Sequence, residues 1–508
     1  MSGTAPTCSL GGGRPRVAEA ATLLVVLAFG AYLRFEGLGL RSLWRDELCT
    51  WEVARMPLAE SLRWGPELTK PPLYQIALRV LTSDPHPSEA MLRLPAAVFG
   101  VLTVVAGWWL GRNAGGVWLG VAAAGMIAVN PLQIFYSREA RPYSMLAFGA
   151  TLMILLWRRV VIGRRMPCFI AFVTASVLTL YAHYLAGWIL IACFFWWVAV
   201  RRKEESASRS LMPLAALMIL GVLCVPLAVR YLAYQSSMFQ GLEWIEPATW
   251  SKAMTVLSEL TFGPEWVLVA LVPAIAVWIA GVFGLSPQRL WKPGGALCTG
   301  PNDVCGLLLL CLLAGWGGLV IVSWLAHPAL VARYALPAAV PAILFPLAVA
   351  HRLDRRAPLV IMFAFALASA PQWLDREVQP GFREMAAYLQ RQVDPKTEAV
   401  VLTIDSTIYP GWEESERLGF AYYPLSGVAI EELRLSADNV TPANDALKDR
   451  RGLYLIVLWA DEEAIVKAAG RRSVSLNVDG RSYSRLLFEP YRLMRLAPLD
   501  LPAERPGD

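Results

Sequence analysis

Residues 17–35 read VAEAATLLVVLAFGAYLRF, and this run decides the class of fold. A helix needs about 20 mostly apolar residues to cross the hydrocarbon of a bilayer. Comparable runs recur along the chain, and we predict about eleven spans on this criterion. They lie at residues 17–35, 91–110, 117–135, 143–157, 167–183, 185–200, 211–230, 266–284, 305–325, 335–350 and 357–372. The sequence therefore predicts a polytopic α-helical membrane protein.

The composition supports this class. The chain has 508 residues, of which 56% are hydrophobic and 17% are charged. A soluble protein would carry about 25% charged residues. The 20 Trp residues fit as well, because Trp is enriched at membrane–water interfaces.

Basic residues gather in every second connection between the predicted spans. Arg14 and Arg16 precede the first span, and 158–165 and 201–209 hold the largest groups. Lys and Arg favour the cytoplasmic side, so residues 1–16 are predicted to be cytoplasmic. An odd number of spans then places the C-terminus outside. The basic groups are explained by topology, so the net charge of +6 does not indicate a nucleic-acid partner.

We predict three parts: a cytoplasmic segment 1–16, a transmembrane catalytic domain 17–372 with a first outer loop 36–89, and a small α/β domain 373–508 on the outer face. The loop is expected to form helices lying on the membrane surface. A second outer loop is predicted at about 231–265 and contains Trp244 and Trp250. In the tail, 381–393 is predicted to be a helix, with Arg383 as a solvated residue on it. Three strands and a second helix are also predicted there, at 399–405, 453–459, 483–488 and 462–469.

Ionisable and tyrosine side chains gather at the predicted outer boundary, where charge close to an apolar span is costly and indicates function. They are Asp46, Glu47, Lys70, Tyr74, Arg93, Arg138, Glu139, Arg141, His183, Tyr184, Arg333 and Tyr334. Acids beside fixed cations suit transfer from a lipid phosphate. Arg binds the departing phosphate, and a carboxylate accepts the proton of the attacking hydroxyl. Carboxylates also stabilise an oxocarbenium-like centre and are oxygen ligands for divalent cations.

The chain resembles the GT-C superfamily of polytopic glycosyltransferases, in the branch of protein O-mannosyltransferases and aminoarabinose transferases. The motifs that carry the resemblance span nearly the whole chain. They are Ser42–Glu47 (SLWRDE), Lys70–Tyr74 (KPPLY), Leu92–Ala96 (LRLPA), Tyr136–Ser144 (YSREARPYS), Tyr181–Tyr184 (YAHY), Arg333–Tyr334 and Gly381–Glu384 (GFRE).

The resemblance implies roles for these residues. Asp46 matches the catalytic carboxylate of the first outer loop, with Glu47 as its partner and Glu139 as the second acidic position. Lys70, Arg141, Arg333 and Tyr334 are expected at the donor phosphate. His183, Tyr184, Arg138 and Tyr74 are further candidates. Members of the superfamily differ in their use of metal, so Asp46 and Glu139 are also candidate ligands for Mg²⁺ or Mn²⁺.

A structural interpretation stands beside each role. Asp46 and Glu47 would otherwise be a solvated loop pair, and Glu139 would pair with Arg141 at a helix end. Arg333 would be an interfacial anchor. His183 would be a packed, hydrogen-bonded histidine, and Lys70 a solvated loop charge.

The function predicted is transfer of a sugar from a polyprenyl-phosphate-linked monosaccharide to a hydroxyl of a protein, lipid or glycan, on the non-cytoplasmic side of a cell membrane. The alternative is a transporter or flippase. Transporters place polar residues near the midplane of interrupted helices, whereas here the charges gather at one boundary. A non-catalytic assembly factor is the third hypothesis, because the role of the tail is not encoded in its sequence.

Overall fold

The computed structural model describes residues 17–61, 71–82, 84–163, 165–201, 211–240, 245–282, 304–374, 381–405, 413–428 and 430–436, and seven short stretches between residues 439 and 498. The chain forms two compact units. The helical unit comprises Met1–Glu36, Thr69–Ala77 and Arg93–Arg376, and the mixed unit comprises Gly37–Leu68, Leu78–Leu92 and Glu377–Asp508.

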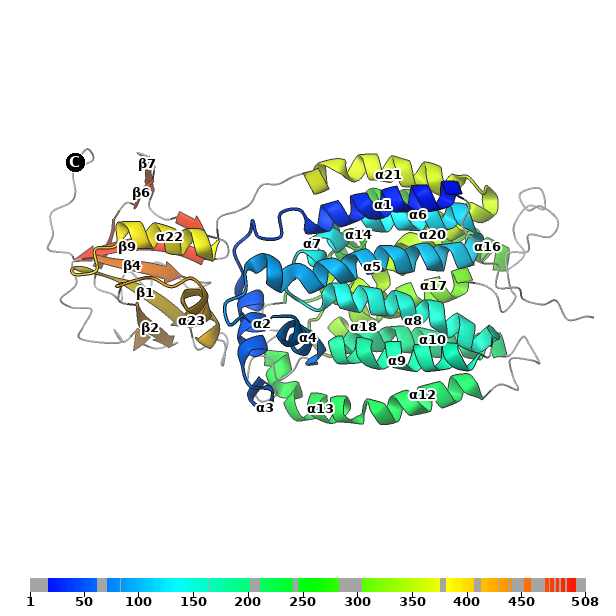
Figure 1. The fold of residues 1–508 in the computed structure, drawn as a ribbon, viewed down its shortest axis with the longest axis horizontal. Coiled ribbons are helices and arrows are strands. Elements are labelled where there is room, and N and C mark those ends of the chain that lie inside the picture. The colour runs from blue at the N-terminus through cyan, green and yellow to red at the C-terminus, as the bar shows by residue number, and fades with distance from the viewer. Residues whose placement is uncertain are drawn as a thin grey trace, which may run out of the picture. The chain divides into compact units, whose positions relative to one another are not determined.

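The helical unit is a bundle whose long helices run lengthwise beside one another (Figure 1). Its principal helices are α1 (Val17–Phe35), α5 (Glu89–Gly115, from Arg93 onward), α6 (Val117–Val129), α7 (Pro131–Ser137), α8 (Tyr143–Gly163), α9 (Met166–Ala182), α10 (Gly187–Arg201), α12 (Met212–Leu223), α13 (Val225–Gln240), α14 (Trp250–Glu259), α15 (Pro264–Trp266), α16 (Val272–Val282), α17 (Val304–Leu312), α18 (Gly318–Leu325), α19 (Ala332–Ala335), α20 (Ala339–Leu353) and α21 (Ala357–Leu374).

Within the described residues, five helices are long and apolar enough to cross a membrane, or eight if each of three bent helix pairs counts as one span. The chain is therefore a mostly helical, multi-pass membrane protein. Every one of the eleven predicted spans falls on a helix or on a bent helical segment. Three of them coincide with apolar helices of only 10–17 residues, such as Met166–Ala182, so the count of eleven stays a prediction.

One bent pair leads into the segment that carries Glu139. Helices α6 and α7 meet at an angle of 60° around Asn130 and Pro131. Pro131 has no backbone N–H, so the carbonyl of Ile127 has no donor one turn further along the helix. Arg34, in the last turn of α1 and fully buried, donates to the carbonyls of Ile127 at 2.9 Å and Ala128 at 2.8 Å. A buried cation thus satisfies the end of α6.

The mixed unit contains a seven-stranded sheet, counted over the described strands, of order β3-β2-β1-β4-β9-β5, with β8 paired to β9. Strands β1 and β2 are parallel, as are β1 and β4, whereas β9 is antiparallel to β4, β5 and β8. The strands are β1 (Glu398–Asp405), β2 (Ile430–Ser436), β3 (Asn439–Val440), β4 (Gly452–Val457), β5 (Arg471–Val474), β8 (Leu486–Phe488) and β9 (Tyr491–Pro498), with a separate hairpin of β6 (Leu476–Val478) and β7 (Arg481–Tyr483).

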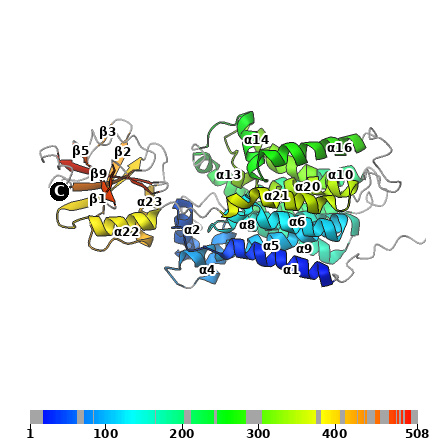
Figure 2. The same cartoon turned by 90° about the horizontal axis from the view of Figure 1, so that it is seen from above.

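Helices α22 (Phe382–Gln392) and α23 (Glu413–Tyr422) lie on the same face of this sheet (Figure 2). The apolar positions of α22 recur with helical spacing, at Phe382, Met385, Ala386 and Leu389, and all four are buried. The ring of Phe382 packs edge-on against Phe420 of α23, with centroids 4.7 Å apart. The predicted helix 381–393 and the strands begun at 399 and 453 fall on α22, β1 and β4. The strand predicted at 483–488 is β8 only from Leu486, and the helix predicted at 462–469 lies outside the described residues.

The loop 36–89 does form helices, which are α2 (Arg45–Arg55), α3 (Leu58–Ser61) and α4 (Leu73–Leu81). Of these, α2, α3 and the last turn of α4 belong to the mixed unit, together with the tail of the chain. Helix α2, which begins with Arg45, Asp46 and Glu47, therefore packs in the same unit as the tail.

Candidate functional site

The short segment between α7 and α8 carries Arg138, Glu139 and Arg141 and is held at both ends. Before it, the side chain of Asn130 accepts a hydrogen bond of 3.0 Å from the N–H of Gln133, which caps α7. After it, the hydroxyl of Ser144 donates to the carbonyl of Tyr136 at 2.9 Å. The charged residues are therefore fixed between two helices of the bundle.

Two of these charges are buried in the helical unit. Glu139 is 8% exposed and Arg141 is 1% exposed. The backbone N–H of Arg141 donates to the carbonyl of Glu139 at 2.7 Å, which folds the segment into a tight turn. Arg138 forms an ion pair of 3.9 Å with Glu36 at the end of α1. Burying a carboxylate and a guanidinium at a span end is costly, which favours a functional role.

A group of aromatic rings joins this segment to two other predicted motifs. Tyr136 packs on Tyr143 with centroids 5.1 Å apart, and Tyr143 packs on His183 at 5.8 Å. His183 also contacts the rings of Tyr184 at 5.0 Å and Tyr334 at 6.1 Å. The motifs around residues 139, 183 and 333 lie far apart in sequence, yet they meet within the helical unit.

Arg333 stands beside this group, with its guanidinium carbon 5.5 Å from the centroid of the Tyr334 ring. Tyr136, three residues before Glu139, lines the same cavity as Arg333 and Glu259. Tyr136 was part of the sequence motif but was not among the predicted site residues. It is the residue that links the Glu139 segment to Arg333.

The imidazole of His183 caps the turn that follows α9. Its Nδ1 accepts a hydrogen bond of 3.4 Å from the N–H of Leu185 and so caps the short turn Tyr184–Ala186 that follows α9. An accepting Nδ1 requires the tautomer that carries its proton on Nε2. Because one ring nitrogen is engaged by the backbone, the packed interpretation of His183 accounts for its position.

A cavity of about 610 Å³ opens beside Arg333 and Tyr136. One wall is the segment Leu330–Arg333, and the other is α14 with the residues just before it. Its charged and hydroxyl side chains are Tyr136, Glu246, Thr249, Ser251, Lys252, Thr255, Glu259 and Arg333. The volume suits a small organic ligand. Carboxylates, hydroxyls and cations together suit a ligand with both hydroxyl and anionic groups.

Sequence reasoning missed the α14 wall, because residues 231–265 were interpreted as an outer loop. The signal was present. Ser251, Thr255 and Glu259 recur every four residues and so lie on one face of a helix, whereas Ala253, Val256 and Leu257 are buried on the other. Trp244, singled out in the same loop, lies outside the described residues, whereas Trp250 is the first residue of α14.

The remaining predicted residues divide between the two units. Asp46 and Glu47 lie in the first turn of α2, in the mixed unit. Glu47 is fully buried, and its Oε2 accepts a hydrogen bond of 3.3 Å from the N–H of Trp44, so it caps the helix that presents Asp46. Tyr74, in α4, is buried in the helical unit. Lys70 lies outside the described residues.

Among the described residues there is no group of three or more His, Cys, Asp and Glu side chains arranged to hold a metal ion. Asp46 lies in the mixed unit and Glu139 in the helical unit, so their role as ligands for Mg²⁺ or Mn²⁺ stays a prediction.

No family model and no curated protein matches this sequence. Among solved structures, the fold is similar to that of ArnT from Cupriavidus metallidurans bound to undecaprenyl phosphate, with a TM-score of 0.50 and 14% identity, covering 96% of this chain and 99% of that one. An oligosaccharyltransferase from Archaeoglobus fulgidus tethered with an acceptor peptide aligns with a TM-score of 0.49 and 13% identity, over 92% and 74% of the two chains. At 14% identity, the likeness to ArnT is one of fold.

Proposed function

The chain has a GT-C-type fold, and from that premise we propose that it is a membrane glycosyltransferase that takes a sugar from a polyprenyl-phosphate-linked monosaccharide. The acceptor is a hydroxyl on the non-cytoplasmic side of the membrane. One observation carries the proposal. A polar cavity in the helical unit is lined by Arg333 and by Tyr136, which is three residues before the buried Glu139.

The donor class is supported from two directions. The ArnT structure of similar fold is bound to undecaprenyl phosphate, a polyprenyl phosphate. In this chain, Arg333 lines the cavity, and Arg141 belongs to the segment of Glu139 and Tyr136. Guanidinium groups suit the phosphate that departs, because they bind two of its oxygens at once and stay charged at every physiological pH.

The proposed reaction balances as a displacement at the anomeric carbon. The acceptor oxygen bonds to this carbon as the bond from the carbon to the phosphate oxygen breaks. The polyprenyl phosphate leaves with the electron pair, facing Arg333 and Arg141, with Tyr334 and Lys70 as further donors. The proton of the acceptor hydroxyl passes to a carboxylate, for which Asp46 is the first candidate and Glu139 the second.

Two measurements test this function. Mass spectrometry of lipids that co-purify with the chain should detect a polyprenyl-phosphate monosaccharide. A panel of undecaprenyl-phosphate monosaccharides then serves as donor, and Asp46→Asn and Glu139→Gln should each reduce transfer by about 10²- to 10⁴-fold. Glu265→Gln is the matched control, since Glu265 is an exposed carboxylate in α15 that does not line the cavity. Wild-type rates in both variants, with normal membrane insertion, would overturn the proposal.

A further inference from the structure

Arg383 does not behave as the solvated helix residue that its sequence indicated. From the first turn of α22, its Nη1 donates to the carbonyl of Gly39 at 3.0 Å and to Oε1 of Glu89 at 3.1 Å. Its Nη2 donates to the carbonyl of Leu40, and its Nε donates to Glu384 at 2.9 Å. One side chain of the tail therefore holds both ends of the first-loop portion of the mixed unit.

Tyr423, directly after α23, completes the same network. Its hydroxyl donates to Oε1 of Glu89 at 3.1 Å and accepts from the N–H of Leu43 at 2.8 Å. Burial raises the pKa of Tyr423, and the Glu89 carboxylate adds to this, so the hydroxyl keeps its proton. We call Arg383, Tyr423 and Glu89 the loop clamp.

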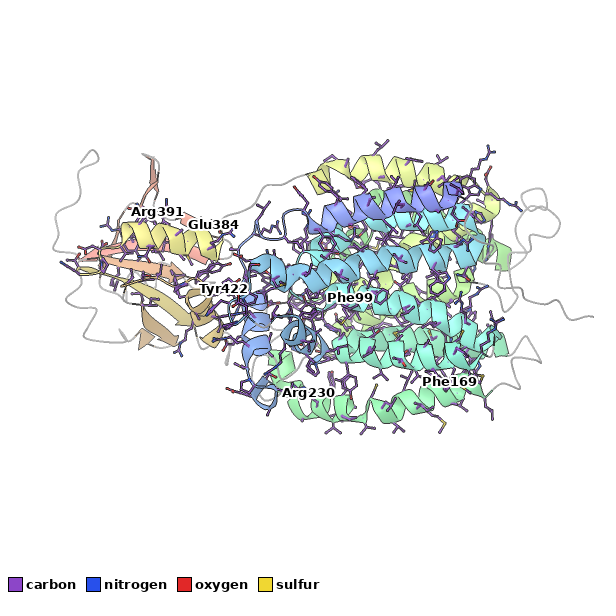
Figure 3. All side chains as sticks on the ribbon, in the orientation of Figure 1. Phe99, Phe169, Arg230, Glu384, Arg391 and Tyr422 are labelled. Carbon is purple, nitrogen blue, oxygen red and sulfur yellow. The ribbon has the colours of Figure 1, made fainter. Side chains whose placement is uncertain are left out.

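A second contact fixes the body of α2. The ring of Tyr422 meets the indole of Trp51 edge to face, with centroids 5.0 Å apart, and its hydroxyl donates to the carbonyl of Pro87 at 2.6 Å. The Trp51 indole N–H donates to the carbonyl of Pro85 at 3.0 Å, and Trp51 is 1% exposed. Tyr422 lies against α2 in Figure 3.

These contacts converge on the residue that the proposed reaction needs. Leu43, which is fully buried and bonded to Tyr423, is three residues before Asp46. Three residues span at most about 10 Å, so an anchor at Leu43 restricts where Asp46 can lie. Trp51, five residues after Asp46 on the same helix, is the second anchor.

We propose that the loop clamp positions the first turn of α2, so that the tail of the chain acts as a positioning element for Asp46. The inference rests on the proposed function, because it assigns Asp46 to the reaction. Arg383, Glu89 and Tyr423 are positioning residues, since they act through the backbone of 39–43 and not on the reacting atoms.

The structural half is tested without any substrate. Hydrogen–deuterium exchange of the full chain in nanodiscs is followed at the Leu43 amide and the first turn of α2. Tyr423→Phe removes the hydroxyl and keeps the ring that stacks on Phe382. Exchange at Leu43 should accelerate by about 2- to 10-fold, the value of one net hydrogen bond. Unchanged exchange at Leu43 in this variant would overturn the clamp.

Matched controls separate this effect from general loosening. Tyr388→Phe removes another hydroxyl from α22. Arg391→Ala removes an exposed arginine at the far end of α22 (Figure 3), whose Nε bonds only within its own helix, to Ala387. Neither should change exchange at Leu43. If either does so as strongly as Tyr423→Phe, the specific role of the clamp is refuted.

The catalytic half is tested by kinetics with the donor panel. Arg383→Ala and Tyr423→Phe should lower kcat by about 10- to 100-fold, as expected for a displaced catalytic group, and leave the KM for donor near its normal value. Arg383→Lys should recover part of the rate. Combining Tyr423→Phe with Asp46→Asn should cost no more than Asp46→Asn alone, because the positioned group is already lost.

The two proposals fail in different ways. Wild-type activity of Asp46→Asn would overturn the proposed function and the catalytic role of the clamp with it, whatever the exchange data show. An inactive Asp46→Asn beside a fully active Tyr423→Phe would leave the proposed function standing and overturn the positioning role.

Discussion

Replacing Arg34 with Met should destabilise the helical unit, because the side chain satisfies the end of a bent helix. Met keeps a long apolar stem in a fully buried site but has no donor for the carbonyls of Ile127 and Ala128. A third bond goes to Gly30, one turn earlier on α1 itself, and it contributes less because it lies within the helix.

The magnitude follows from the two carbonyls of α6. A buried acceptor left without a partner costs about 1–3 kcal/mol. Hydrogen bonds between membrane helices average about 0.6 kcal/mol and reach about 1.7 kcal/mol, which sets the lower bound. For two carbonyls these values span about 1–6 kcal/mol, and we expect a loss of about 2–4 kcal/mol because each bond is assisted by the charge of the donor.

The assay is reversible unfolding of the full chain in mixed micelles, followed by tryptophan fluorescence. Arg34→Lys is the companion variant. It keeps the charge but has one nitrogen, instead of a planar fork, to reach the two carbonyls. Its free energy of unfolding should therefore lie between those of wild type and Arg34→Met. The reasoning is refuted if Arg34→Met is as stable as wild type, or if the Lys variant is the less stable of the two.

Three further changes have definite expected outcomes. Gly100→Ala would place a Cβ too close to the hydroxyl of Ser137 and 2.9 Å from Nε of Arg34, so it should lower the free energy of unfolding by about 1–3 kcal/mol. Gly163→Ala is the control, because its Cβ would meet no atom within 4 Å, and it should leave the free energy of unfolding unchanged. His183→Asn keeps an acceptor for the Leu185 N–H, so this variant should retain both stability and sugar transfer. His183→Ala has no such acceptor and should be less stable. A stable but inactive His183→Asn variant would show that the imidazole ring itself takes part in the reaction. Burial raises the pKa of Glu384, but its bonds to the Gly381 N–H and to Arg383 outweigh this and hold the pKa below its usual range. Its contribution to stability is therefore complete above the unfolded pKa of about 4.3 and is lost as the pH falls through the folded pKa, so Glu384→Gln should flatten the acid side of a stability–pH curve.

The positions of the helices were predictable because length and apolarity alone decide whether a segment can cross a bilayer. The prediction for residues 17–35 coincides with α1. The prediction for 117–135 missed the 60° bend, although Asn130-Pro131 is a cap followed by proline, which is a sequence signal for a new helix start. Helix α14 was not predicted, because the tryptophan residues of 231–265 were interpreted as interfacial loop residues. The helical spacing of polar and apolar residues in α14 was therefore overlooked.

The partners of charged residues were not predictable in the same way. Arg383 bonds to Gly39 and Leu40, more than 340 residues earlier in the chain, and no local pattern encodes such a contact. His183 and Tyr334 were expected only to share a membrane boundary, and the packing of the His183 ring against Tyr143 and Tyr334 is a finding of the structure. Asp46 as the acid, Lys70 as a phosphate ligand and the α/β tail on the outer face stay predictions.

A charge near an apolar span indicates function only after its hydrogen bonds are traced. Arg34 donates to the end of α6, Glu47 accepts from Trp44 at the start of α2, and His183 accepts from Leu185. In each case the polar atoms serve the backbone at a helix end, where free N–H and C=O groups need partners. Arg333 also lines the cavity in the helical unit, where a ligand can reach it. This position ranks it above His183 as a candidate to touch substrate, and it predicts that Arg333→Gln should weaken donor binding, measured as a higher KM for the donor.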